Sequence, residues 1–385
     1  MERSLRPKSV DSQGKKVRVG IFFGGRSVEH EVSITSGKTI CHHIDENKYH
    51  AIPVFQSCDG RVFLLSLDFV LQTSTKKFDS LFENNATQIH WCELPRLVDF
   101  VFIASHGRYS EDGCLQGFLE FLEIPYLGTK VCGSAVGMNK EFQQKILKAN
   151  KIQTPSGFTI PAHVASLSIG AEIFRLAEQH AVEFPCIVKP ASEGSSFGVT
   201  KVKSQKDFAS AVQKASTCGG SLGESVLVEA FLEGSEFTCV LLEDERGLPF
   251  WRSLGVTEVV LAPGASIYDY AQKYGQTLAK KFLPARFDPA VCEKIESECI
   301  KACVALGFST FARIDGIVDC HGVPYLFDAN TISGMAEKSF LFLHAAYAGM
   351  DHRAFISKLI DIELEKLRAK EPLIKVGQTG CAKEL

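Results

Sequence analysis

The stretch FARIDGIVDCHGVPYLFDANTISGM, residues 311–335, decides the fold of this 385-residue chain. Its pattern predicts two apolar strands joined by a tight turn at 320–322, where a glycine supplies the backbone angles that such a turn needs. A two-residue loop would place Asp315 opposite Asp328, with their Cβ atoms about 5 Å apart. Carboxylates at that separation repel each other, so we expect positive charge between them.

The same register pairs Arg313 with Asn330 and puts all four polar side chains on one face of the hairpin. The other face is then apolar, formed by Ile314, Val318, Phe327 and Ala329. Carboxylate and amide oxygens suit Mg²⁺ bound together with phosphates, so Asp315, Asp328 and Asn330 are candidate metal ligands. A polar face that is simply solvated explains the same residues, and the hairpin alone does not decide between the two interpretations.

The composition is that of an ordinary globular protein, with 45% hydrophobic residues, 23% charged residues and a formal net charge of −3. The length suffices for two or three domains. Charge gives no reason to expect a nucleic-acid partner, and no apolar run or signal sequence gives reason to expect a membrane. The thirteen cysteines are scattered without a CxxC pair, which favours buried thiols in a reducing cytoplasm. Cys299 and Cys303 are expected in a core.

Two strand ends in the first third of the chain are candidate ligand-binding positions. Residues 17–23 (VRVGIFF) form a predicted strand, followed by a glycine pair and a helix over 31–44, the opening of an α/β unit. Another apolar strand is predicted over 99–105, and His106 follows it. Ligands bind at such strand ends in open α/β sheets, but a loop histidine is as often structural, so both interpretations stay open.

A phosphate-binding segment is predicted in the middle of the chain. The strand at 184–190 (FPCIVKP) carries Lys189 in an otherwise apolar run, and such a lysine either reaches water or meets a fixed anion. The loop 193–198 (EGSSFG) follows it and offers backbone donors to a phosphate. A mobile turn explains the loop as well, but its pairing with Lys189 favours phosphate.

The poorly periodic segment at 268–274 is expected to be a lid or functional loop. The remaining predicted elements are helices over 133–148 (carrying Lys140), 289–306 and 354–367, and strands over 225–232 and 236–243.

In their order along the chain, these motifs resemble those of the D-alanine–D-alanine ligases, members of the ATP-grasp superfamily, over roughly residues 16–370. The matching stretches are GGRSVEHEVS at 24–33, HGRYSEDGCLQG at 106–117, MNK at 138–140, IVKPASEGSSFGV at 187–199, VEAFLEGSEFT at 228–238, YDYAQKY at 268–274, ARIDG at 312–316 and LFDANTISGM at 326–335.

The resemblance implies an α/β fold, α+β in the ATP-grasp part, in which a Rossmann-like open sheet precedes two ATP-grasp subdomains. The expected parts are a flexible extension at 1–16, a substrate-binding domain at 17–136, a phosphate-loop subdomain at 137–228, a subdomain with the adenine, metal and oxyanion sites at 229–370, and a tail at 371–385.

The resemblance also implies an activity. ATP would phosphorylate one D-alanine, and the amine of a second would attack the acyl phosphate to give D-alanyl-D-alanine for peptidoglycan precursors. Two Mg²⁺ ions, replaceable by Mn²⁺, a homodimer and a cytoplasmic location are implied as well.

The family's functional residues map onto this chain as follows. ATP would be held by Lys140, Lys189, Glu193, Ser196, Glu229, Ala230, Leu232, Glu236 and Lys273, and the metal ions by Asp315, Asp328 and Asn330. Catalysis would use Glu29, Ser195, Tyr274, Arg313 and Gly334, and the substrates would be held by His106, Ser339 and Phe340. Glu29, Ser195 and Tyr274 would latch the lid, while Arg313 and the Gly334 backbone would stabilise the oxyanion.

Three positions depart from the family pattern: Asp328 stands where Glu is usual, Ser333 replaces a proline, and Ala230 replaces a common lysine. Two competing hypotheses therefore accompany the main one. The first is a ligase of the same mechanism that uses D-serine or D-lactate, although YDYAQKY favours D-alanine as the nucleophile. The second is a nucleotide-binding relative without turnover.

Overall fold

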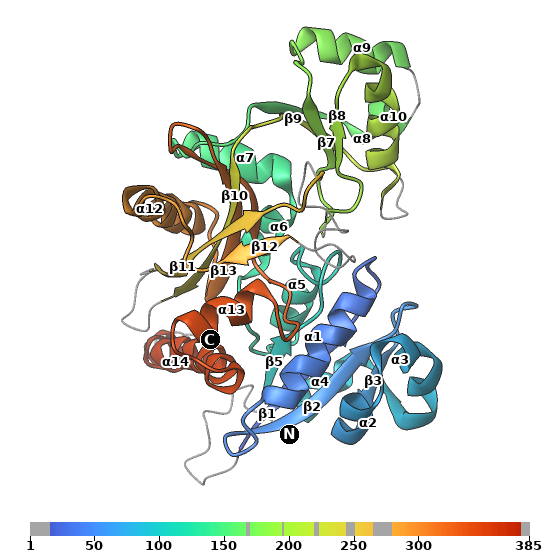
Figure 1. The fold of residues 1–385 in the computed structure, drawn as a ribbon. Coiled ribbons are helices and arrows are strands. Elements are labelled where there is room, and N and C mark those ends of the chain that lie inside the picture. The colour runs from blue at the N-terminus through green and yellow to red at the C-terminus, as the bar shows by residue number, and fades with distance from the viewer. Residues whose placement is uncertain are drawn as a thin grey trace.

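The computed structural model describes residues 16–166, 170–194, 196–218, 223–243, 251–264 and 279–378 (Figure 1). Ser195 and the segment at 268–274, with Lys273 and Tyr274, lie outside the described residues, and so does the latch predicted between Glu29, Ser195 and Tyr274. The described strands form three sheets, each covered by helices.

The N-terminal sheet has the strand order β4-β3-β2-β1-β5. β1 runs parallel to β2 and β5, whereas β3 pairs antiparallel with β2 and β4. The central strands are almost fully buried, as expected where helices cover both faces of a parallel sheet. The elements are β1 (Val17–Gly24), α1 (His30–His43), β2 (Tyr49–Gln56), β3 (Val62–Leu65), α2 (Leu67–Gln72), α3 (Thr75–Leu81), η1 (Phe82–Asn85), β4 (Ala86–Ile89), η2 (Trp91–Glu93), α4 (Leu94–Leu97), β5 (Phe100–Ile103) and α5 (Cys114–Phe121).

The second sheet is fully antiparallel in the order β6-β9-β7-β8, and it lies with three helices at the top of Figure 1. Its elements are β6 (Gly157–Ile160), α8 (Ala162–Ser166), α9 (Gly170–Gln179), β7 (Cys186–Pro190), β8 (Thr200–Val202), α10 (Gln205–Ser216) and β9 (Val226–Ala230).

The third sheet, also antiparallel, has the order β12-β11-β10-β13-β14. The predicted consecutive strands at 225–232 and 236–243 are both present, but the chain changes sheets between them. Cys299 and Cys303 are fully buried in the core beneath this sheet, as predicted. The elements are α6 (Val131–Met138), α7 (Lys140–Ala149), β10 (Ser235–Glu243), β11 (Trp251–Val260), β12 (Lys280–Phe282), α12 (Pro289–Ala305), β13 (Phe311–Val318), β14 (Pro324–Asn330), α13 (Phe340–Tyr347) and α14 (His352–Gln378).

The hairpin of β13 and β14 keeps the predicted facing pairs but not the predicted turn. Asp315 lies opposite Asp328. The turn is not a two-residue loop: it spans 319–323 and is closed by the Asp319 N–H, which donates to the Val323 carbonyl at 3.1 Å. The Asp319 carboxylate organises this longer turn by accepting from two of its backbone N–H groups.

A β-bulge at Phe327 restores the register that the longer turn would otherwise shift. Gly316 pairs with Leu326, whereas Asp315 already pairs with Asp328, so Phe327 is an extra residue on β14. As a result Leu326 is buried in the core, and the prediction that Phe327 belongs to the apolar core face is wrong.

The single helix predicted over 133–148 is two helices, α6 and α7. The chain breaks at Asn139, whose extended backbone lets its side-chain oxygen accept from the Phe142 N–H at 3.1 Å as a helix cap. Lys140 is therefore the first residue of α7, and its own N–H donates to the Ala191 carbonyl at 2.8 Å. At the other end of the chain, α14 runs to Gln378, into the region predicted as a tail.

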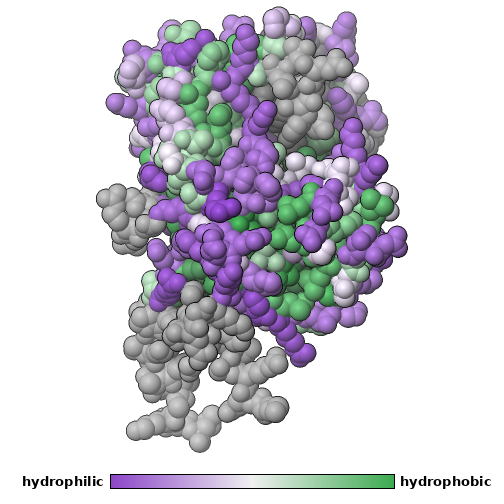
Figure 2. All heavy atoms as spheres, turned by 60° about the horizontal axis from the view of Figure 1, so that its bottom comes forward, coloured by the Kyte–Doolittle hydropathy of each residue, from purple (hydrophilic) through white to green (hydrophobic). Residues whose placement is uncertain are grey.

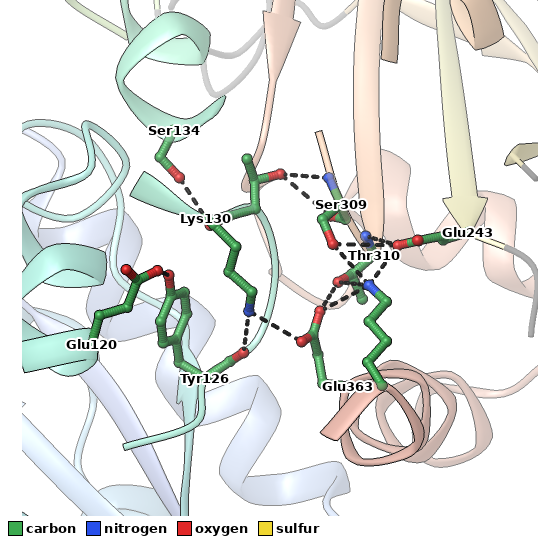
Figure 3. Close-up of polar contacts among 10 residues, drawn as sticks. Glu120, Tyr126, Lys130, Ser134, Glu243, Ser309, Thr310 and Glu363 are labelled. Carbon is green, nitrogen blue, oxygen red and sulfur yellow. Dashed lines mark hydrogen bonds and ion pairs between the residues drawn. The ribbon is translucent and has the colours of Figure 1, made fainter. Parts of the chain in front are cut away.

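A buried polar network, drawn in Figure 3, joins the parts of the molecule near the start of β13. The Glu363 carboxylate on α14 meets Lys130, which precedes α6, at 3.1 Å and Lys366 at 3.2 Å, and it accepts a hydrogen bond from Thr310. Lys366 also contacts Glu243 at the end of β10 at 2.5 Å. Burial favours a raised pKa for Glu363, but the two ammonium groups outweigh it and hold the pKa below its usual value.

Figure 2 shows the face at the bottom of Figure 1, where hydrophilic side chains predominate and hydrophobic ones form separate patches among them. Among the described large hydrophobic side chains, Phe121 at the end of α5 is the most exposed, at 85%. None of the helices in the described ranges is both long and apolar enough to span a bilayer.

Candidate active site

Two cavities meet at the carboxylate pair of the β13–β14 hairpin. The first, of about 370 Å³, lies between the second and third sheets, and the second, of about 520 Å³, lies between the N-terminal part and the hairpin. Lys140, Gly194, Asp315 and Asp328 line both cavities. A ligand in one cavity can therefore touch a ligand in the other at this point.

The first cavity gathers most of the predicted ATP-binding residues. It is lined by Lys140, Lys189, Glu193, Ser196, Glu229, Ala230, Leu232 and Glu236, together with Asp315 and Asp328. Its remaining wall is largely apolar, which suits a flat ring system with a few directed polar contacts. Sequence reasoning did not identify this apolar wall, which includes Ile187, Phe197, Val199, Phe231, Val260, Leu261, Ile317 and Phe327.

Lys189 was expected either to reach water or to meet a fixed anion, and the structure shows the second. The anion is a protein carboxylate. Its Nζ lies 2.7 Å from Glu229 Oε2, and the two side chains are only 6% and 4% exposed. Gln144 donates to the other Glu229 oxygen, and the Phe327 carbonyl lies 3.4 Å from the ammonium. A buried ion pair needs such additional hydrogen bonds to offset its desolvation.

The positive charge expected at the carboxylate pair comes from both sides. Lys140 Nζ lies 3.5 Å from Asp328 Oδ1 and donates to the Glu193 carbonyl at 2.8 Å. Arg313 Nη2 lies 3.0 Å from Asp315 Oδ2, and the Thr238 hydroxyl donates to the other Asp315 oxygen at 2.8 Å. Each carboxylate is thus oriented by its own cation.

Arg108 and Glu224, to which sequence reasoning gave no role, line neither cavity but form ion pairs next to Glu193 of the first cavity. The Arg108 guanidinium lies 3.0 Å from Glu193 Oε1 and 2.6 Å from Glu224 Oε2. Burial raises the pKa of Glu193, although Arg108 opposes the shift. The contacts tie the loop at 193–198 to the N-terminal part. The available signal was that Arg108 shares the HGR motif with His106.

The second cavity gathers the predicted substrate-binding and catalytic residues that the structure describes. They are Glu29, His106, Arg313, Gly334, Ser339 and Phe340, next to the predicted metal ligands Asp315, Asp328 and Asn330. Glu111, Lys281 and Lys338 also line the cavity and were not predicted. The three catalytic or cofactor predictions Ser195, Lys273 and Tyr274 lie outside the described residues.

His106 lines the cavity and also forms hydrogen bonds with two serines of α1. Its Nε2 lies 2.7 Å from the Ser36 hydroxyl, and its N–H donates to the Ser33 hydroxyl at 2.9 Å. Ser36 also accepts from the Met335 N–H at 3.2 Å, so the histidine connects α1 with the loop that carries Gly334. Burial, with a smaller effect of Arg313, lowers the pKa of His106 to about 4, so the imidazole is neutral at pH 7.

Glu111 adds a carboxyl group to the end of this cavity. The Gly107 N–H donates to its Oε2 at 2.6 Å. Burial raises the pKa of Glu111 well above its ordinary value, and the nearby Glu29 carboxylate raises it further. Potential ligand atoms of Glu29, His106 and Glu111 lie within 4.8 Å of one another. Carboxyl groups of Glu29 and Glu111 and cationic groups of Arg313 and Lys281 therefore line the same cavity.

Known proteins resemble this chain in both sequence and fold. A family model described as the D-ala D-ala ligase N-terminus matches residues 18–129, and one described as the D-ala D-ala ligase C-terminus matches residues 165–361. The D-alanine–D-alanine ligase of Halothermothrix orenii is 32% identical over 354 residues, which cover 91% of this chain and 99% of that protein. The D-alanine–D-alanine ligase A of Chromobacterium violaceum is 32% identical over 381 residues, with 94% and 99% covered.

Solved structures resemble most of the chain as well. The VanG D-Ala:D-Ser ligase from Enterococcus faecalis superposes with a TM-score of 0.76 at 27% identity and covers 91% of this chain and 100% of its own. The D-alanine–D-alanine ligase from Bacillus anthracis complexed with ATP gives a TM-score of 0.69 at 25% identity, with 92% and 99% covered.

Two antiparallel sheets lie on either side of the first cavity, and an α/β sheet precedes them in the sequence. This architecture defines an ATP-grasp enzyme and confirms the predicted fold class. The chain belongs to the D-alanine–D-alanine ligase family, as its motifs predicted.

Proposed function

We propose that this protein joins two D-alanines into D-alanyl-D-alanine at the expense of ATP, through an acyl-phosphate intermediate, for peptidoglycan precursor synthesis. One observation carries the proposal: the two cavities share Lys140, Gly194, Asp315 and Asp328. A nucleotide in the first cavity would direct its γ-phosphate to this point, and a D-alanine in the second would bring its carboxylate to it. Positioning and charge neutralisation are the main requirements of phosphoryl transfer.

In the first cavity, the polar groups would hold the nucleotide around its apolar wall. Glu229, Leu232 and the Ala230 backbone would contact adenine, and Glu236 the ribose. Lys140, Lys189, Ser196 and the backbone of the 193–198 loop would contact phosphates. Ser195, Lys273 and Tyr274 are proposed for ATP and lid contacts on the family resemblance alone.

The donor set at the junction fits Mg²⁺. Asp315, Asp328 and Asn330 offer oxygen atoms on two adjacent strands, facing the point where phosphates would lie. Bound Mg²⁺, or Mn²⁺ in its place, would supply charge neutralisation to the transferring phosphoryl group. Lys140 and Arg313 would orient Asp328 and Asp315, respectively, for this task.

In the second cavity, Glu29 would hold the first D-alanine's ammonium near His106, which is neutral and therefore does not repel it. Arg313 and the Gly334 N–H would stabilise the oxyanion of the tetrahedral intermediate. Ser339, which caps α13, and the Phe340 N–H would receive the carboxylate of the second D-alanine.

Ligation of D-alanine to D-serine is the second candidate, because the VanG D-Ala:D-Ser ligase is among the structures that superpose over most of the chain. A ligase with D-lactate as its nucleophile and a nucleotide-binding protein without turnover are the third and fourth candidates. A homodimer and a cytoplasmic location are further proposals supported by the family resemblance, and light scattering during size-exclusion chromatography tests the former.

The experiment is phosphate release from ATP and Mg²⁺ in the presence of D-alanine, D-serine plus D-alanine, or D-lactate plus D-alanine, with each product identified by mass. We expect D-alanine alone to stimulate phosphate release and to yield dialanine. A main product of D-alanyl-D-serine or D-alanyl-D-lactate, distinguished by its mass, would instead support the second or the third candidate, respectively. ATP binding without phosphate release under every condition would refute ligase activity.

A further inference from the structure

A second group of potential metal ligands lies away from the carboxylate pair, where α1, the loop after β14 and α14 meet. His43 belongs to the last turn of α1, Glu337 to the loop, and His352 is the first residue of α14. His43 Nε2 lies 2.9 Å from Glu337 Oε1, and His352 Nε2 lies 3.3 Å from Glu337 Oε2. Ligand atoms of all three lie within 4.8 Å of one another.

These distances are those of a tetrahedral metal site. An ion with bonds of about 2.0–2.1 Å to nitrogen and oxygen has its ligand atoms roughly 3.3 Å apart. His43 and His352 lie 2.9 and 3.3 Å from different oxygens of Glu337, and one ligand atom from each of the three groups lies within 4.8 Å of the others. Binding an ion would turn the two imidazole nitrogens and one carboxylate oxygen toward a common point between them.

Both imidazole rings are already held in place. His43 and His352 stack with ring centroids 4.5 Å apart, His42 packs edge-on against His43 at 4.6 Å, and Phe342 packs against His352 at 4.1 Å. The side chains of His43, His352 and Glu337 are 25%, 27% and 53% exposed, so an ion can enter from solvent.

We propose that His43, Glu337 and His352 bind a transition-metal ion of the Zn²⁺ type, with three protein ligands and a fourth position open to solvent. Two imidazole nitrogens and one carboxylate favour such an ion over Mg²⁺, which prefers an all-oxygen shell. The site is thus chemically distinct from the carboxylate pair, and the inference does not depend on the proposed function.

The ion would link separate parts of the fold beside the second cavity. Glu337 lies in the stretch 334–340, of which Gly334, Ala336, Lys338, Ser339 and Phe340 line that cavity. A metal bond from Glu337 to His43 and His352 would tie this wall to the N-terminal sheet through α1 and to the C-terminal helix. The site is therefore placed to stiffen the wall of the second cavity.

The first test measures Zn²⁺ binding to the full-length, untagged chain by competition with a chromophoric chelator in excess Mg²⁺, which occupies oxygen sites. Cysteines elsewhere also bind Zn²⁺, so the measured quantity is the difference from wild type. We expect His43→Ala and His352→Ala each to lower the affinity for one equivalent of Zn²⁺ at least about tenfold. His50→Ala, which removes an exposed histidine on β2 outside the cluster, should keep wild-type binding.

The competing explanation is a clasp held by hydrogen bonds alone, since His352 Nε2 also lies 3.1 Å from the Glu337 carbonyl. Glu337→Gln separates the two, because an amide still accepts hydrogen bonds but is a poor Zn²⁺ ligand. On the proposal, Zn²⁺ raises the melting temperature of wild type and of His50→Ala but not of Glu337→Gln. Equal Zn²⁺ binding and equal melting shifts in wild type, His43→Ala and Glu337→Gln would overturn the metal site and leave the clasp.

Discussion

Asp315 and Asp328 face each other across β13 and β14 because a five-residue turn and a one-residue bulge offset each other. The turn at 319–323 alone would place Phe327 opposite Asp315 and turn Asp328 toward the core. The bulge at Phe327 restores the pairing of Asp315 with Asp328, so Asp328 joins Phe327 on the face of the hairpin that lines the first cavity. One local irregularity thus places a carboxylate at the junction and an aromatic ring in the cavity wall.

Asp315→Asn should abolish most turnover while the domain stays folded. The amide keeps an oxygen that can accept from Thr238 but loses the charge that would hold Mg²⁺ and pair with Arg313. We expect the Mg²⁺ concentration for half-maximal activity to rise on the order of 100-fold. Asp319→Asn, in the turn of the same hairpin, is the matched control and should keep wild-type Mg²⁺ dependence. Wild-type kinetics in Asp315→Asn would rule out the metal assignment.

Ser333 stands where the family usually has proline, and its buried hydroxyl accepts from Arg313 Nη1 at 3.2 Å. Ser333→Ala removes a bond that orients the guanidinium proposed to stabilise the oxyanion. If the lost hydrogen bond removes about 1 kcal/mol of transition-state stabilisation, kcat should fall about fivefold, with the KM for ATP unchanged. Ser333→Thr keeps the hydroxyl and should restore kcat. An unchanged kcat in Ser333→Ala would show that this bond does not assist the reaction.

Glu363→Gln should destabilise the protein at neutral pH, because it removes the carboxylate at the centre of the network in Figure 3. The remaining Lys130 and Lys366 side chains are 44% and 29% exposed and stay partly hydrated, so the loss should be about 1–3 kcal/mol, less than for a fully buried ion pair and measurable by urea unfolding. The folded-state pKa of Glu363 is lowered, so the ionised form stabilises the fold above the unfolded pKa of about 4.3, and this contribution is lost as pH falls through the folded pKa.

The stability difference between wild type and Glu363→Gln should therefore shrink below about pH 4. Glu120→Gln is the control: Glu120 is exposed and only accepts a hydrogen bond from Tyr126, which an amide can also accept. Glu120→Gln should change the free energy of unfolding by no more than about 0.5 kcal/mol. A Glu363→Gln effect of the same small size at pH 7 would contradict the structural role of the network.

Two buried histidines should make stability fall between pH 6.5 and pH 4. Burial lowers the pKa values of His106 and His344 to about 4, so the unfolded chain binds more protons than the folded chain in this interval. Each histidine then costs about 2 kcal/mol of unfolding free energy by pH 5 relative to pH 7.5. His106→Gln should flatten the pH profile by that amount, measured by urea unfolding at fixed salt. A profile parallel to wild type would show that His106 is not held neutral by burial.

The sequence by itself determined which residue types meet. Alternation along β13 and β14 put Arg313, Asp315, Asp328 and Asn330 on one face, because side chains in a strand point to opposite sides in turn. Local order also placed Lys189 in an apolar strand ahead of a loop of small residues. These predictions depend on neighbours along the chain, which is why they could be made without the fold.

Tertiary structure alone decided the partners. The bulge at Phe327 follows from packing Leu326 into the core, and the anion that meets Lys189 is Glu229 on the neighbouring strand β9. His43 and Glu337, 294 residues apart, become neighbours only because α1 packs beside the C-terminal helices. Periodicity specifies which face of an element is buried, whereas the packing of elements distant in sequence specifies what that face touches.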